Sequence, residues 1–74
     1  MSDKEAYELL LKYCGGEKGL AMIREMILVA GVEVAIKNTI DVLYEKHPTA
    51  PQDFHGWIRQ SYNYIEEQMN QPLN

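Results

Sequence analysis

Apolar residues recur at helical intervals in four successive segments of this 74-residue chain. In the first segment, residues 3–14, they have the spacing i, i+3, i+4 and i+7, which is typical of one face of an amphipathic helix. These positions are Ala6, Leu9, Leu10 and Tyr13. Ser2 and Glu5 have the spacing of a capping box at the helix start, and Gly15 follows its end. The pattern therefore predicts a first helix over residues 3–14.

Further helical segments are predicted at residues 17–30, 32–46 and 50–70. Their apolar positions again repeat every three or four residues: Leu20, Ile23, Met26, Ile27 and Ala30; Val32, Ile36, Ile40 and Leu43; and Phe54, Trp57, Ile58, Tyr62, Ile65 and Met69. Pro48 and Pro51 mark a loop before the last helix. Thr49 and Gln52 have capping-box spacing at its start, with Asp53 as the competing cap. Residues 71–74 are expected to fray.

The stretch MILVAGVEVAIK, residues 26–37, decides how the middle of the chain is arranged. The apolar stripes before and after Gly31 point in different directions on one continuous helix. Either the chain breaks at Gly31, or one helix buries opposite faces against different partners. Gly31 favours a break, whereas the lack of a capping residue before Val32 favours continuity. We predict an all-α domain over residues 1–74, a bundle of three to four helices with a bend or break near Gly31.

Composition limits the function classes. The formal charge of −4 opposes nonspecific binding to phosphate backbones. A helix-turn-helix DNA-binding regulator is therefore only the third hypothesis, also because residues 32–46 carry net negative charge and no arginine. The single Cys14 cannot form an internal disulfide and fits a reducing compartment. No secretory leader or apolar run of about 20 residues occurs, so the expected location is the cytoplasm, without a membrane anchor.

The sequence contains few candidates for a catalytic, metal-binding or phosphate-binding site. Cys14 with His47 or His55 is a conceivable nucleophile and base, but the sequence does not bring them together. His47, Asp53 and His55 lack a recognised metal-ligand spacing. The glycines of residues 14–19 lack the preceding strand and the Gly-Lys-Ser/Thr ending of a phosphate-binding loop. We expect no catalytic residue, metal, cofactor or small-molecule substrate, and hence a non-enzymatic protein.

A self-association surface is predicted at Val29, Val32 and Ile36. These residues lie away from the face that Leu20 and Ile23 turn toward the core, and so short a chain has little with which to cover both faces. The expected assembly is a homodimer.

A second candidate surface comprises Trp57, Gln60, Tyr64 and Gln68 on one flank of the last helix. Aromatic residues at partly exposed positions are favoured interface anchors, although the same residues could cover the edge of a small core. The leading hypothesis is a self-associating protein-interaction module. The alternative is a small acidic regulator or inhibitor, of the kind phages and mobile elements encode, that binds a larger host protein.

Overall fold

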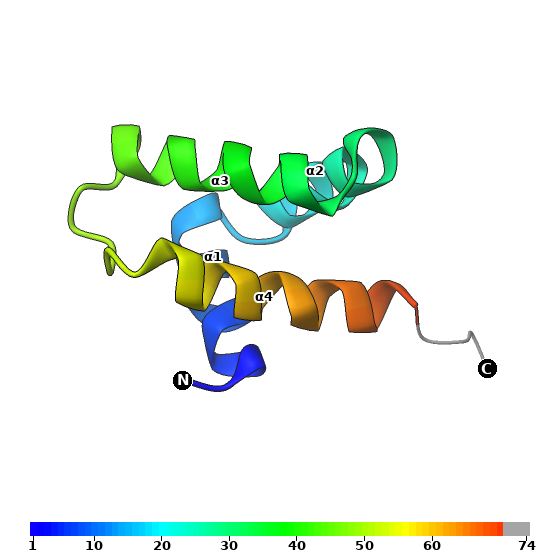
Figure 1. The fold of residues 1–74 in the computed structure, drawn as a ribbon, viewed down its shortest axis with the longest axis horizontal. Helices are drawn as coiled ribbons and strands as arrows, with labels where there is room; N and C mark the ends of the chain where they lie inside the picture. The colour runs from blue at the N-terminus through cyan, green and yellow to red at the C-terminus, as the bar shows by residue number, and fades with distance from the viewer. Residues whose placement is uncertain (71–74) are drawn as a thin grey trace.

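Four helices follow one another along residues 1–70, the part of the chain that the computed structural model describes (Figure 1). They are α1 (Asp3–Cys14), α2 (Glu17–Ala30), α3 (Val32–Lys46) and α4 (Phe54–Met69). No strand occurs within these residues. The predicted all-α bundle of three to four helices is confirmed, and the number of helices within these residues is four. The predicted frayed tail, residues 71–74, lies outside the described residues.

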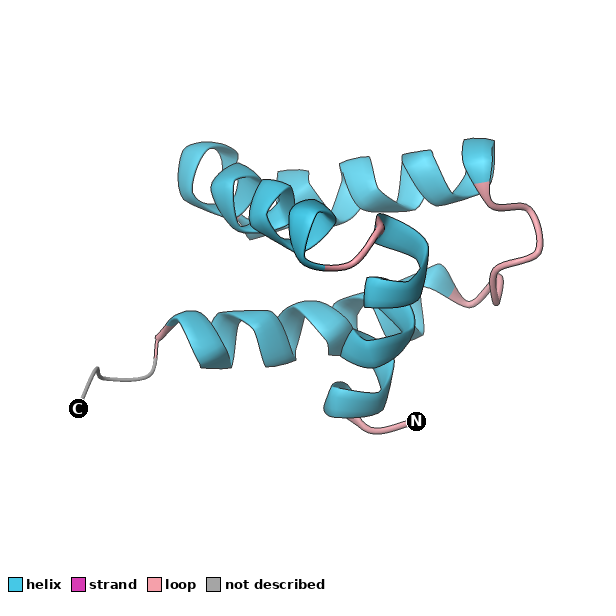
Figure 2. Ribbon diagram, turned by 180° about the vertical axis from the view of Figure 1, so that it is seen from behind, coloured by secondary structure: helices cyan, strands magenta, loops and turns pink. Residues whose placement is uncertain are grey.

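The four helices differ in direction. α3 and α4 run antiparallel and are joined by the loop at residues 47–53 (Figure 1). α1 crosses α4 and ends beside the start of α2, which leads to the corner with α3 (Figure 2). α4 packs against both α1 and α3, and α2 packs against α3 and α1.

The start of α1 forms the predicted capping box. The Glu5 backbone N–H donates to the Ser2 hydroxyl over 3.1 Å, and the Ser2 backbone N–H donates to the Glu5 carboxylate over 3.0 Å. The hydrogen bond from the Ser2 backbone is the main cause that lowers the pKa of Glu5. At the other end, Gly15 adopts the left-handed conformation, with φ 86° and ψ 25°, which terminates the helix where the sequence predicts it.

The corner between α1 and α2 depends on a close backbone approach at Gly19. A Cβ atom at this position would lie 1.8 Å from the Cys14 carbonyl oxygen. Because that neighbour is backbone rather than a flexible side chain, only glycine lets α2 start so close to the end of α1.

The chain breaks at Gly31, which confirms the first of the two predicted alternatives. Gly31 has φ 92° and ψ 163° and separates Ala30, the last residue of α2, from Val32, the first of α3. This conformation differs from the left-handed helical cap that ends α1, and it belongs to a region that is essentially restricted to glycine. The break lets α3 turn back and pack against α2 and α4.

Replacing Gly31 with alanine is expected to lower the free energy of unfolding by about 1–3 kcal/mol, because an L side chain strains this backbone conformation. No atom lies within 4 Å of the added Cβ, so the cost is conformational rather than steric. Denaturant titration measures the loss. Chemically synthesised protein with D-alanine at residue 31 is the control, because a D residue favours positive φ. Equal stability of the two alanine forms would contradict the strained geometry.

The start of α4 differs from the prediction. The helix begins at Phe54 rather than residue 50, and the Thr49–Gln52 capping box is wrong. The Gln52 side-chain amide donates instead to the carbonyls of Pro48 and Ala50, over 3.3 and 2.8 Å. Asp53 occupies the N-cap position but makes no side-chain capping hydrogen bond. Pro51 argues against a helix start at residue 50, because it disfavours helical geometry in the residue before it.

The core lies where α4 meets the other helices, and Tyr62 of α4 ties it to α3. The buried Tyr62 hydroxyl donates to the Ala35 carbonyl over 3.1 Å and pairs with the Thr39 hydroxyl over 2.6 Å. Burial raises the pKa of Tyr62. These bonds satisfy the polar group of Tyr62 in a largely apolar core, in which Ser61 is also buried and donates to the Ile58 carbonyl over 2.6 Å. The buried hydrophobic residues of the core are Ala6, Leu10, Leu20, Ile23, Ala35, Ile36, Ile40, Leu43, Ala50, Phe54, Trp57, Ile58, Tyr62 and Ile65.

Candidate interaction surfaces

The side of α2 that faces away from the core carries the three most exposed large apolar residues within residues 1–70. Met22, Leu28 and Val29 are 68%, 77% and 80% exposed. They alternate with exposed Lys18, Ala21 and Glu25 at intervals of three and four residues, so all six lie on one side of the helix. We call this set, Lys18, Ala21, Met22, Glu25, Leu28 and Val29, the α2 outer face.

An apolar groove of about 430 Å³ adjoins this face between α1, α2 and α3. Met22 and Met26 of α2 and Val42 of α3 contribute to its apolar walls. The Asn38 side-chain amide donates to the Met26 sulfur over 3.3 Å. Methionine side chains adapt to partners of different shape, so the groove is suited to an apolar side chain of another protein. Its remaining lining residues are Leu10, Tyr13, Cys14, Gly19, Ile23, Asn38, Thr39, Leu43, Lys46 and His47.

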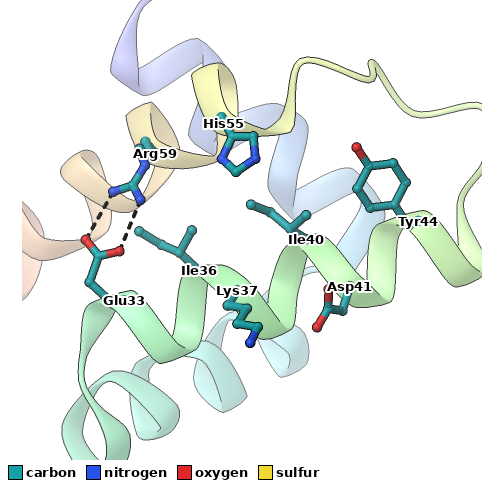
Figure 3. A pocket seen from close by; sticks show the side chains of 8 residues that line it. All are labelled: Glu33, Ile36, Lys37, Ile40, Asp41, Tyr44, His55 and Arg59. Carbon is teal, nitrogen blue, oxygen red and sulfur yellow. Dashed lines mark hydrogen bonds and ion pairs between the residues drawn. The ribbon is translucent and has the colours of Figure 1, made fainter.

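A second groove, of about 310 Å³, lies between α3 and α4 and is charged (Figure 3). At one end both terminal nitrogens of Arg59 donate to the two carboxylate oxygens of Glu33, each over 3.1 Å. The hydrogen bond from Arg59 is the main cause that lowers the pKa of Glu33. Ile36 and Ile40 form the groove's apolar part, and its remaining side chains are those of Lys37, Asp41, Tyr44 and His55.

The three residues predicted for self-association have different environments. Val29 is on the α2 outer face, and Val32 is half-buried and packs against the core. Ile36 is only 4% exposed and belongs to the core. The expectation for Ile36 is therefore corrected: the break at Gly31 turns its face of α3 inward, where the chain's own helices cover it.

The prediction that Trp57 is a partly exposed partner-binding residue is also corrected. It is 3% exposed, and its indole N–H donates to the Pro51 carbonyl over 2.9 Å. Its ring centroid lies 6.3 Å from that of Tyr13 and 6.2 Å from that of Phe54. Trp57 is thus a core residue between α1 and the loop before α4, and the monomer leaves almost none of it for a partner.

The other members of the predicted flank are mainly engaged within the chain. Tyr64 is half-buried with its ring centroid 4.6 Å from that of Tyr7. The Gln60 amide donates to the Met1 carbonyl over 2.6 Å. Gln68 is exposed. The structure does not assemble these residues and Trp57 into one exposed aromatic patch.

The residues considered for chemistry are not arranged around a reaction centre. Cys14 and His47 both line the apolar groove, but the Cys14 thiol donates weakly to the carbonyls of Leu11 and Gly16, over 3.8 and 3.7 Å. Burial raises the pKa of the Cys14 thiol, which disfavours the nucleophilic thiolate. The His47 ring packs edge-on against Tyr13. Within residues 1–70, no three His, Cys, Asp or Glu side chains are grouped to hold a metal ion.

Met22 and Leu28 were not included in the predicted interface, although the sequence contains the signal for them. Together with Ala21 and Val29 they form a second stripe on α2, opposite Leu20 and Ile23. A helix with apolar residues on two opposite sides buries one against its own fold and presents the other to solvent or to a partner.

Comparison of the chain with protein-family models, curated proteins and solved structures found no match. None of the helices within residues 1–70 combines the length and the apolar character that crossing a bilayer requires.

Proposed function

We propose that this chain is a non-enzymatic protein-interaction module that associates with a second copy of itself. The observation that carries the proposal is the α2 outer face, on which Met22, Leu28 and Val29 are largely exposed. Clustered apolar surface of this kind is characteristic of protein interaction sites. Val29 retains its predicted place in the interface, while Met22 and Leu28 replace Val32 and Ile36 as its main apolar contacts.

The size of the chain supports the same proposal. A domain of 74 residues buries only about 60% of the surface that its unfolded chain exposes, so its stability is modest. Covering α2 with a second copy would add stability through binding to the folded state. We place the module in the cytoplasm, because its single cysteine fits a reducing compartment.

Sedimentation velocity over a range of protein concentrations tests the proposal. The wild-type chain should change from monomer to dimer as its concentration rises. Met22→Asp places a charge on the α2 outer face and is expected to raise the dimer dissociation constant at least about tenfold. Asn63→Asp adds the same charge at an exposed position of α4 and is the matched control. A wild-type chain that stays monomeric up to millimolar concentration would contradict self-association.

A second candidate function is that of a small acidic regulator or inhibitor that binds a basic surface of a larger host protein. Its support is that the ion pair between Glu33 and Arg59 is the only one within residues 1–70, while the chain carries eleven acidic residues. Apart from Glu5, whose carboxylate accepts the Ser2 backbone N–H, the remaining carboxylates can meet a basic partner. This candidate predicts a monomer that captures one specific host protein, with affinity that falls steeply as salt rises.

A further inference from the structure

We propose that two copies of the chain pair through antiparallel α2 helices, with Lys18 of each copy facing Glu25 of the other. This inference rests on the proposed self-association and specifies its partner, orientation and register. It follows from the order of charged and apolar side chains along the α2 outer face.

Lys18 and Glu25 lie on one line along this face. They are seven residues apart, which is two helical turns or about 10.5 Å. Both are exposed, and neither takes part in an ion pair within residues 1–70. Ala21 and Met22 lie between them, so the order along the face is base, small apolar residue, large apolar residue, acid.

This order of side chains is complementary to the same order on a second, antiparallel α2 helix. A two-fold axis between Ala21 and Met22 places Ala21 of one copy opposite Met22 of the other. The same axis places Lys18 opposite Glu25 twice, once on each side. The small alanine side chain lets the two helix backbones approach closely, and the flexible methionine fills the remaining space.

The C-terminal end of each α2 helix can also fit against the turn that precedes α2 in the second copy. In this register Leu28 extends over the turn at Gly15 and Gly16 of the second copy. A Cβ atom added at either glycine would find no atom within 4 Å, so this turn has open space beside it. The turn of the second copy therefore leaves room for the side chain of Leu28, which is one of the two most exposed large apolar residues of α2.

Charge distinguishes this register from its competitors. Parallel pairing would place Lys18 against Lys18 and Glu25 against Glu25. Antiparallel pairing centred on Glu25 would bring Met22 near Leu28 but would also bring the two Glu25 carboxylates together. Each copy already carries a formal charge of −4, so additional like-charge contacts oppose association. Only the register centred between Ala21 and Met22 pairs both charges with their opposites.

Charge exchange at these two positions is the main test. Lys18→Glu and Glu25→Lys each create two like-charge contacts in the dimer, and each is expected to raise the dissociation constant at least about tenfold. The double variant exchanges the charges and should return within about threefold of wild type. Sedimentation velocity measures all three variants, and circular dichroism verifies that they are folded. Glu8→Lys, at an exposed position of α1, controls for the change in net charge in Glu25→Lys, and Lys4→Glu, also exposed in α1, controls for the opposite change in Lys18→Glu.

Disulfide trapping tests the register independently, in a Cys14→Ser background. Met22→Cys places two thiols almost opposite each other, about 1.5 Å apart along the helix axes, and should give a cross-linked dimer. Leu28→Cys places its thiols about 20 Å apart along the axes and should not. Rapid cross-linking at residue 28 but not at residue 22 would overturn the proposed register.

The outcomes separate the two proposals. A wild-type chain that is monomeric at all concentrations contradicts self-association and the pairing together. A dimer that the single charge reversals leave unchanged, or that the double variant fails to restore, contradicts the pairing alone and leaves self-association standing. A dimer that Glu25→Gln strengthens indicates the register centred on Glu25 and also overturns this one.

Discussion

Replacing Trp57 with alanine is expected to lower the free energy of unfolding by about 3–5 kcal/mol. The side chain is 3% exposed and lies between α1 and the loop before α4. Its removal leaves a cavity beside Tyr13 and Phe54 and also removes the hydrogen bond to the Pro51 carbonyl. For a domain of this size, whose total stability is about 4–11 kcal/mol, that loss is a large fraction.

Denaturant titration at one fixed protein concentration measures this effect, because any association also stabilises the folded state. Trp57→Phe keeps an aromatic ring in the core and should recover much of the loss. Gln68→Ala changes an exposed residue of the same helix and should alter stability by no more than about 0.5 kcal/mol. If Trp57→Ala weakened dimer formation while stability stayed within about 1 kcal/mol, Trp57 would be a surface anchor after all.

Local sequence signals predict the boundaries of α1 and the break between α2 and α3, because each of these has a local cause. Ser2 and Glu5 start α1, Gly15 ends it, and the change in direction of the apolar stripe at Gly31 marks the break between α2 and α3. For α4 the sequence predicts too early a start, because the spacing of Thr49 and Gln52 matches a capping box. The conformational effect of Pro51 on its neighbour outweighs that match.

The environment of Trp57 could not be read from the sequence in the same way. α4 packs against α1 on one side and α3 on the other, so its buried arc is wider than one partner helix requires. Trp57 contacts α1 at one edge of this arc, and Tyr62 contacts α3 at the other. A helical wheel shows that both residues flank the central stripe, but it does not show which neighbouring elements cover them.

The position of Ile36 depends on whether the chain continues as one helix through Gly31 or breaks there. On a continuous helix through Gly31, its face would point away from the core that Leu20 and Ile23 build. With the break, α3 folds back, and the same face meets that core, where Ile36 is 4% exposed. The correction from interface to core thus follows from the backbone at one glycine rather than from any property of residue 36.

Ile36→Glu is therefore expected to destabilise the monomer itself, by at least about 3–5 kcal/mol. The substitution removes buried apolar area and places a carboxylate under the charged groove, three residues from the carboxylate of Glu33 (Figure 3). Ile36→Gln has a similar size without the charge, so the difference between the two variants isolates the cost of burying a charge. Ile36→Val is the graded control, with an expected loss of about 0.5–1.5 kcal/mol.

Unfolding and sedimentation measured on the same samples distinguish a core position from an interface position. If Ile36 is in the core, Ile36→Glu lowers the unfolding midpoint or abolishes folding, while Ile36→Val keeps the oligomeric state of the wild type. An interface residue would behave differently, because its charge would separate the copies and leave each one folded. A folded, monomeric Ile36→Glu protein derived from a dimeric wild type would return residue 36 to the interface and would contradict the inward orientation of α3.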